Sequence, residues 1–360
     1  MNGLGNESTS DSLPGNSGMP PANIQSDVVG ENTEIETDAS NADVTDEGVA
    51  DMRTTQRLST TTAGSEVFNH FEEHGRTYHA YKPGKYLLPN DEKEQDRLDL
   101  QHHLWLLTLG NERLYLAPIA EQLRTVGGGK VLDMCTGTGI WAIDFADQHP
   151  ATEVIGIDLS PIQPKHVPPT LKFEIDDLEE PWIFNEKFTF IHGRMLFSCF
   201  SNPVGVIGQG FRNLQPGGFL EIQDALLWFR CDERSLEGTA MEMWEKKLHD
   251  AAWRCGKDWA CPTKYKQYME DAGFIGVKEV HYRWPINPWP TDQHEKEKGK
   301  WSLQNLLLGL ESISMALMTR YLGMSEHEVR EVIKRMEKEI KNRKIHAYIP
   351  ISVVYGQKPK

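Results

Sequence analysis

One stretch of this 360-residue chain, residues 129–160, constrains the fold more than any other. A short apolar run in it ends in Asp133, and a turn that contains Gly137 and Gly139 follows. A run of apolar residues at helical spacing comes next, and a second apolar run closes on Asp158. This order of strand, glycine turn, helix and acid-tipped strand is typical of half a nucleotide-binding α/β unit. Because glycine lets the backbone approach a ligand and a helix N-terminus offers free N–H groups, we predict a nucleoside-containing ligand here.

Two kinds of nucleoside ligand fit this stretch. Residues 137–142 match the G-x-G-x-x-G/A fingerprint of dinucleotide binding, and Asp158 follows about 20 residues later, as in an NAD-dependent dehydrogenase. Asp133 argues against NAD, because its negative charge would lie beside a pyrophosphate but would attract a cationic sulfonium and ammonium. A third apolar run ends in Asp176 and Asp177, which are suited to accept the amino group of an adenine. Acids after three successive strands favour S-adenosylmethionine, which is cationic and carries no phosphate, and NAD is the alternative.

Longer sequence matches point to one family. The chain resembles the LaeA-like methyltransferases of filamentous fungi, a class I S-adenosylmethionine-dependent family, over residues 66–360. The matching stretches are GTGIWAIDFAD, VIGIDLSPIQP, FEIDDLEEPW, FIHGRM, LQPGGFLEIQD, INPWP and IHAYIP. The resemblance implies a doubly wound, Rossmann-like α/β fold with a seven-stranded, mostly parallel sheet and helical cap insertions. It implies methyl transfer to a small-molecule acceptor in fungal secondary metabolism or, alternatively, a nuclear regulator that acts with velvet-family partners.

The expected cofactor site draws on the strand ends, the glycine turn and a segment ahead of them. The residues expected to contact S-adenosylmethionine are Tyr86, Asp133, Cys135, Gly137, Gly139, Asp158, Leu159, Asp177, Leu178 and His192. Asp158 is expected to hold the ribose hydroxyls. Asp177 is preferred to Asp176 for the adenine, since only one of two neighbours at a strand end faces the pocket. Tyr86, like Tyr78 and Tyr81, belongs to a possible lid that would cover the sulfonium by cation–π contact.

His192 is the candidate catalytic residue, and no metal site is predicted. It lies at the tip of the fourth expected strand, and an unperturbed histidine pKa of about 6.5 suits a general base. The alternative is a histidine at a strand end that binds backbone or lines the cofactor pocket.

Cys135 departs from the pattern of the family, which usually has glycine at this position of the turn. A cysteine adopts a positive φ less readily than glycine, and its side chain would crowd the methionyl end of the cofactor. We therefore expect the departure to affect cofactor affinity more than the fold.

The chain divides into a tail and one domain. The tail, residues 1–65, holds eleven acidic and two basic residues with few apolar ones, and we predict that it is disordered. The methyltransferase domain spans residues 66–360. Its expected parts are an N-terminal helical and lid segment at 66–128, a cofactor-binding core at 129–224, and helical insertions at 225–262 and 284–345. We expect the insertions to form a cap over the substrate, lined by Trp228, Trp284, Trp289 and Trp301.

Charge and cysteine content limit the partners and the compartment. The formal net charge of −15 offers no basic face for nucleic acid or an anionic membrane. The N/D-P-P-Y signature of nucleic-acid methylating enzymes is missing after the fourth expected strand, where residues 192–195 read HGRM. Five cysteines without a C-x-x-C pair indicate a reducing compartment, and no secretory or spanning segment is seen. We therefore expect a cytoplasmic or nuclear protein without direct nucleic-acid or membrane binding.

Hydrophobic periodicity predicts alternating strands and helices. Strands are expected near 130–134, 153–157, 171–175, 187–191, 218–223, 277–283 and 347–356. Helices are expected near 91–110, 139–148, 203–214 and 263–272, with one more in the first insertion and two in the second. Ser325 and Glu328 predict a capping box at the start of the last helix.

Overall fold

The computed structural model describes residues 69–110, 112–125, 127–233 and 236–360. The predicted disordered tail, residues 1–65, lies outside the described residues. Within the described ranges, no helix combines the length and apolar character needed to cross a membrane.

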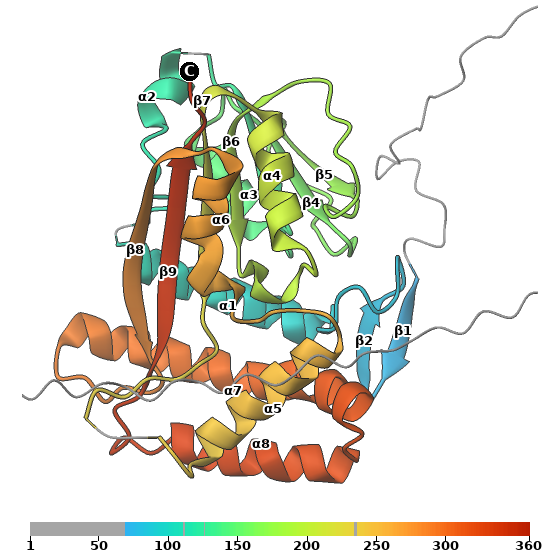
Figure 1. Cartoon of the computed structure of the whole chain (residues 1–360), viewed down its shortest axis with the longest axis vertical. Helices are drawn as coiled ribbons and strands as arrows, with labels where there is room; N and C mark the ends of the chain where they lie inside the picture. Colours follow the sequence, from blue (N-terminus) through green and yellow to red (C-terminus); the bar gives the residue numbers. More distant parts are fainter. Residues whose placement is uncertain (1–68, 111, 126, 234–235) are drawn as a thin grey trace, which may run out of the picture. The chain divides into compact units, whose positions relative to one another are not determined.

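A seven-stranded sheet forms the centre of the fold, with the strand order β5-β4-β3-β6-β7-β9-β8 (Figure 1). Its strands are β3 (Lys130–Met134), β4 (Glu153–Asp158), β5 (Leu171–Ile175), β6 (Phe188–Arg194), β7 (Leu214–Ala225), β8 (Ile275–Pro285) and β9 (Tyr348–Gln357). Neighbouring strands are parallel except at β9, which is antiparallel to both β7 and β8. The predicted seven-stranded, mostly parallel sheet is therefore confirmed. The reversed strand also distinguishes it from the dinucleotide-binding sheet, whose six strands follow the order 3-2-1-4-5-6.

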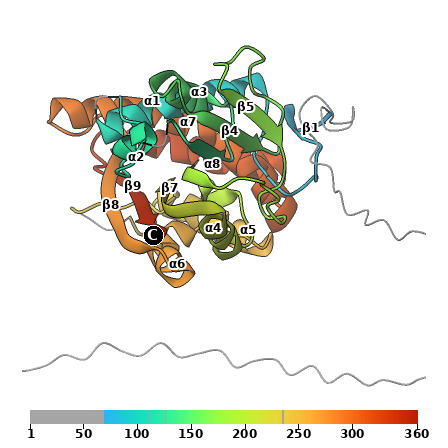
Figure 2. The same ribbon diagram turned by 90° about the horizontal axis from the view of Figure 1, so that it is seen from above.

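Helices cover both faces of this sheet, and its central strands β3, β4 and β6 are accordingly buried along almost their whole length. On β3, Val131 belongs to the apolar core under α3 (Ile140–Gln148), whereas the next residue, Leu132, belongs to the core on the other face. Seen from above, α3 and the short α2 (Ala120–Thr125) lie on one face, and α4 (Pro203–Asn213) and α6 (Tyr265–Ala272) on the other (Figure 2). Two 3₁₀ turns, η2 (Leu196–Ser198) and η3 (Cys261–Lys264), complete the connections.

Four further helices gather across the carboxyl ends of the parallel strands (Figure 1). They are α1 (Glu92–Leu109), α5 (Ala240–Arg254), α7 (Gln293–Leu322) and α8 (Glu326–Ile340). The side chain of Asp91 caps α1 by accepting the N–H of Glu94, and Gly110 follows its last turn, as predicted. Ser325 and Glu328 form the predicted capping box of α8.

A hairpin ahead of α1 was not expected from the sequence. Its strands, β1 (His70–Glu73) and β2 (Arg76–His79), are short and charged, so they lack the apolar alternation that identifies a strand. Arg76 anchors the hairpin, because its guanidinium pairs with Asp91 at 2.5 Å and donates to Ser312 of α7 at 2.9 Å. The hairpin thereby fixes the segment that leads into α1.

Candidate functional site

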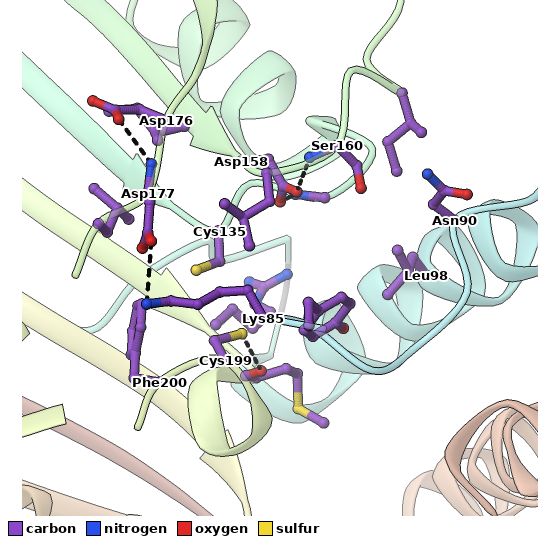
Figure 3. Close-up of a pocket in the computed structure, with 18 of the residues that line it drawn as sticks. Lys85, Asn90, Leu98, Cys135, Asp158, Ser160, Asp176, Asp177, Cys199 and Phe200 are labelled. Carbon is purple, nitrogen blue, oxygen red and sulfur yellow. Dashed lines mark hydrogen bonds and ion pairs between the residues drawn. The ribbon is translucent and has the colours of Figure 1, made fainter. Parts of the chain in front are cut away.

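The largest group of predicted site residues lines one cavity at the carboxyl ends of β3, β4 and β5, here called the strand-end cavity (Figure 3). The segment before α1 and the first turns of α1 form its opposite wall. Seven of the ten residues expected to contact a cofactor line it: Tyr86, Cys135, Gly137, Asp158, Leu159, Asp177 and Leu178.

Asp158 ends β4 and points into the strand-end cavity (Figure 3). Its Oδ2 accepts the backbone N–H of Gly137 at 2.8 Å, and its Oδ1 accepts that of Ser160 at 2.9 Å. Burial raises the pKa of this carboxyl, although these N–H groups oppose the effect. Each carboxylate oxygen has a further lone pair, so Asp158 retains capacity to accept two hydroxyls of a ligand.

Asp177 follows β5 and is 4% exposed. Its Oδ2 lies 3.0 Å from the Lys82 ammonium and 3.2 Å from that of Lys85, and its Oδ1 accepts the N–H of Glu179. Burial opposes ionisation, but these donors outweigh it and hold the pKa of Asp177 below its ordinary value. Asp176 also lines the cavity and accepts the N–H of Asp177. Both acids therefore lie where the sequence expects the adenine.

The glycine turn depends on backbone conformations that favour glycine. Gly139 begins α3 with φ +82°, and a Cβ there would lie 2.3 Å from the ring of Phe173. The absence of a Cβ at Gly139 therefore allows the turn to pack closely on β5. Gly139 does not line the strand-end cavity. Cys135 also has a positive φ, +52°, although it is not glycine. Its thiol contacts Cys199, and this contact and burial raise its pKa well above the ordinary value, so the thiol is neutral at pH 7.

A second cavity, the glycine-turn cavity, adjoins the first and shares Cys135, Gly137 and Arg194 with it. The predicted residues Asp133 and His192 line this second cavity.

Asp133 is a buried acid held by two side chains. It is 3% exposed, accepts the Thr136 hydroxyl at 2.5 Å, and is hydrogen-bonded to His192 Nδ1 at 2.7 Å. The ring of His192 is 0% exposed and stacks on Trp141, with centroids 3.7 Å apart. Burial lowers the pKa of His192 to about 4, although Asp133 opposes the effect. The ring is therefore neutral at pH 7 and donates its Nδ1 proton to Asp133.

Arg194, at the end of β6, carries the cation that both cavities share. Its Nε donates to Gln223 at 2.9 Å, Nη1 is bonded to His102 at 3.0 Å, and the guanidinium lies over the Trp105 ring. Burial lowers its pKa to about 10, which leaves it charged at pH 7. Its Nη2 is buried and has no hydrogen-bond partner within the described ranges. An unpaired buried donor on a cation suits an anionic ligand group.

The structure distinguishes among the aromatic residues that the sequence proposed. Of the three lid tyrosines, only Tyr86 lines the strand-end cavity. Tyr78 is 1% exposed and stacks on Phe71, and Tyr81 lies beside the Lys82 ammonium.

Three of the four tryptophans expected in the cap pack against histidines: Trp228 stacks on His249, Trp289 stacks on His346, and Trp301 contacts His103 at a tilt of 58°. They are placed by packing, which periodicity alone does not reveal.

Several lining residues were missed by sequence reasoning. Lys85, Leu98 and Cys199 line the strand-end cavity, and Met195 lines both cavities at φ +57°. Only the dense charged and aromatic composition ahead of α1 signalled that this segment approaches the site. In the described part of the chain, no group of three or more His, Cys, Asp or Glu side chains is placed to hold a metal ion.

The chain is similar to a family model and to several fungal proteins. A family model described as a methyltransferase domain matches residues 108–279. Methyltransferase pytC of Aspergillus terreus is 34% identical over 303 residues, which cover 84% of this chain and 92% of that protein. The secondary metabolism regulator LAE1 of Cochliobolus heterostrophus is 35% identical over 298 residues, covering 81% and 96%. The probable methyltransferase tdiE of Emericella nidulans is 34% identical over 267 residues, covering 74% and 82%.

Substitution of Cys135 tests the backbone strain in the turn. We expect Cys135→Val to lower the free energy of unfolding by roughly 2 kcal/mol, because a β-branched residue tolerates a left-handed conformation poorly. Cys135→Gly, the matched control, should change it by less than about 1 kcal/mol, since relief of strain offsets the entropy that glycine loses on folding. Urea unfolding measures the free energy of unfolding of both variants. Equal stability of the two would contradict a strained, left-handed backbone at residue 135.

The buried His192 should make the fold sensitive to acid. Its folded-state pKa of about 4 lies below the ordinary value, so the unfolded chain binds more protons as the pH falls from about 6.5 to 4. The free energy of unfolding should therefore decrease across this window, and His192→Gln should show a smaller decrease. His281→Gln, at a histidine that is 71% exposed, is the control. The unfolding midpoints of all three proteins are measured at pH 7 and pH 5. An equal loss of stability in all three would refute the contribution of His192.

Proposed function

This chain belongs to the family of fungal S-adenosylmethionine-dependent methyltransferases that includes pytC and the LaeA regulators, and we propose that it methylates a small molecule of secondary metabolism. The observation that supports the proposal best is the strand-end cavity, where Asp158, Asp177 and the glycine turn face one space. Its relatives pytC and tdiE are named as methyltransferases, and laeA and LAE1 as regulators of secondary metabolism.

The two adjoining cavities fit the two halves of S-adenosylmethionine. When bound, this cofactor would supply a methyl group whose carbon bonds to a nucleophilic atom of the acceptor as its bond to sulfur breaks, so that S-adenosylhomocysteine leaves. We propose that the strand-end cavity holds the adenosine, with Asp158 on the ribose and Asp177 or Asp176 on the adenine amino group. The glycine-turn cavity would then hold the methionyl part, whose carboxylate Arg194 Nη2 would bind.

Asp133 and His192 are proposed to act as a pair. The Asp133 carboxylate supplies negative charge beside the glycine-turn cavity, which favours a cationic ligand group. His192 holds that carboxylate by its Nδ1 proton, and Trp141 fixes the plane of the ring. Because the ring is fully buried, we assign His192 the role of a positioning residue in place of the general base considered from the sequence.

The residues that face the cofactor can speed transfer by holding the reacting groups close together. Correct orientation of two reactants contributes up to about 7–11 kcal/mol to a reaction of this kind. Tyr86, Leu98 and Met195 also line the strand-end cavity, and we propose that they position the acceptor.

A second candidate function is regulatory. The relatives laeA and LAE1, at 34–35% identity, are named as regulators of secondary metabolism, and we propose as the alternative that this chain has such a role and acts through velvet-type protein partners. Such a protein, tagged and isolated from its fungal host, should co-purify with velvet-type proteins in stoichiometric amounts. A metabolite-methylating enzyme should not co-purify with them. We expect a regulator to lie in the nucleus and a metabolite-methylating enzyme in the cytoplasm.

Calorimetric titration with S-adenosylhomocysteine and with NAD tests the cofactor assignment. We expect binding of the first and none of the second. Asp158→Ala should weaken binding roughly 100-fold, because two hydrogen bonds to a carboxylate are lost. Asp147→Ala, at an exposed acid of α3, is the control and should bind normally. Binding of NAD by the natural protein would contradict the methyltransferase assignment of the site.

A ligand without the amino-acid group isolates the role of Arg194. The natural protein should bind S-adenosylhomocysteine more tightly than 5′-methylthioadenosine, which lacks the carboxylate and ammonium. Arg194→Met should reduce that preference by about tenfold or more, since a charge-assisted hydrogen bond is lost, and leave affinity for methylthioadenosine unchanged. Arg194→Lys should restore part of the preference. If Arg194→Met weakens both ligands equally, Arg194 acts only on the fold.

A further inference from the structure

A third cavity, here called the α1–α7 chamber, lies between these two helices and the segment that follows β6. It shares Tyr86, Leu98 and Met195 with the strand-end cavity. Leu98 and Met195 also line the glycine-turn cavity, so all three cavities meet at these two side chains. A molecule in the chamber would therefore reach the point where the proposed adenosyl and methionyl positions join.

The walls of the chamber are mainly apolar. Phe197 of η2, Leu227 of the loop after β7 and Leu306 of α7 line it, and Trp284 adds its ring from the end of β8. The one polar atom of that ring, Nε1, donates to the Thr108 hydroxyl at 2.7 Å and is unavailable to a ligand. Contact with this surface favours an apolar molecule of small size.

The charged groups at the chamber neutralise one another. Arg97 lines it, and its Nε and Nη2 donate to one oxygen of Glu94 at 3.0 and 2.7 Å. Its Nη1 donates to Asn305 at 2.9 Å. Arg97 and Glu94 are 4% and 2% exposed, so the pair is buried and adds no net charge. A charged ligand would lose its hydration here without gaining a counter-ion.

Two polar groups at the chamber retain their hydrogen-bonding capacity. Gln101 and Ser198 are each 4% exposed, and in the described ranges neither side chain forms a hydrogen bond with the protein. Buried amides and hydroxyls usually have partners. The Gln101 amide lies at the border of the chamber and the glycine-turn cavity, where it can donate to and accept from a hydroxyl.

We propose that the α1–α7 chamber binds the methyl acceptor, and that the acceptor is a neutral, largely apolar small molecule with hydroxyl or carbonyl groups. This inference rests on the proposed function, because the junction at Leu98 and Met195 becomes the transfer point only if the cofactor occupies the other two cavities. It also revises the expected cap: α7 lines the chamber, whereas no described residue of α5 lines any of the three cavities.

Two ligands of equal size test the proposal. The protein is saturated with S-adenosylhomocysteine and titrated with 2-naphthol, a neutral hydroxyarene, and with 2-naphthoate, its anionic counterpart. We expect 2-naphthol to bind and 2-naphthoate to bind at least about tenfold more weakly, since the described residues that line the chamber offer the anion no free cation. Gln101→Leu should weaken 2-naphthol about fivefold through loss of one hydrogen bond.

A pair of variants on α7 locates the binding. Ile313→Trp fills the chamber and should abolish 2-naphthol binding, whereas Leu307→Trp, on the same helix but outside the lining, should preserve it. Both positions are half-buried aliphatic residues, so their effects on folding are matched. Thermal unfolding and affinity for S-adenosylhomocysteine are measured for each variant.

The outcomes separate this inference from the proposed function. Failure to bind S-adenosylhomocysteine would overturn the proposed function and with it the chamber. Normal binding of S-adenosylhomocysteine without binding of 2-naphthol would overturn only the proposal that the chamber binds the acceptor. Equal binding of both naphthalenes, or binding that Ile313→Trp leaves intact, would overturn the assignment of a neutral acceptor to this place.

Discussion

The packing of α7 against α1 determines what lies over the carboxyl ends of the strands. The two helices approach closely at Gly309, where a Cβ would lie 3.4 Å from the side chain of Arg97. A buried hydrogen bond from Arg97 to Asn305 joins them, and a second, from Arg76 to Ser312, ties β2 to α7. Removal of one member of such a network leaves buried polar groups unpaired, so the arrangement specifies one position of α7. That position in turn encloses the α1–α7 chamber and secures the hairpin before α1.

Charge is distributed differently in the three cavities. In the strand-end cavity the lysines of the segment before α1 pair with Asp177, and a ligand that engages this acid must share it with them. In the glycine-turn cavity the acid Asp133 and the cation Arg194 both line the space, which suits a zwitterionic ligand. In the chamber the charges of Arg97 and Glu94 neutralise each other through direct hydrogen bonds. The three environments suit the nucleoside, amino-acid and neutral-acceptor positions that we propose for them.

Local sequence signals predicted the elements well, because each was strong within a single segment. The apolar runs that form the seven strands and the helical spacing after Gly139 identify the sheet and α3 without reference to distant residues. The hairpin before α1 escaped prediction, since two four-residue charged strands carry no such signal and depend on Arg76 for their place. The position of Cys135 at a positive φ followed from the glycine that the family has there, and the structure shows that cysteine adopts it.

The sequence alone determined the strand, turn and helix of the nucleoside-binding unit and the acids at the strand ends, because parallel strands bring their carboxyl ends to one edge. Tertiary structure decided which side chains face that edge. It selected Tyr86 from three tyrosines, buried His192 under Trp141, and left Arg194 Nη2 without a hydrogen-bond partner among the described residues. It also formed the chamber from residues of α1, α7 and the strand ends that are distant along the chain. Periodicity reports only whether a residue is buried, whereas the identity of its neighbours depends on how whole elements pack.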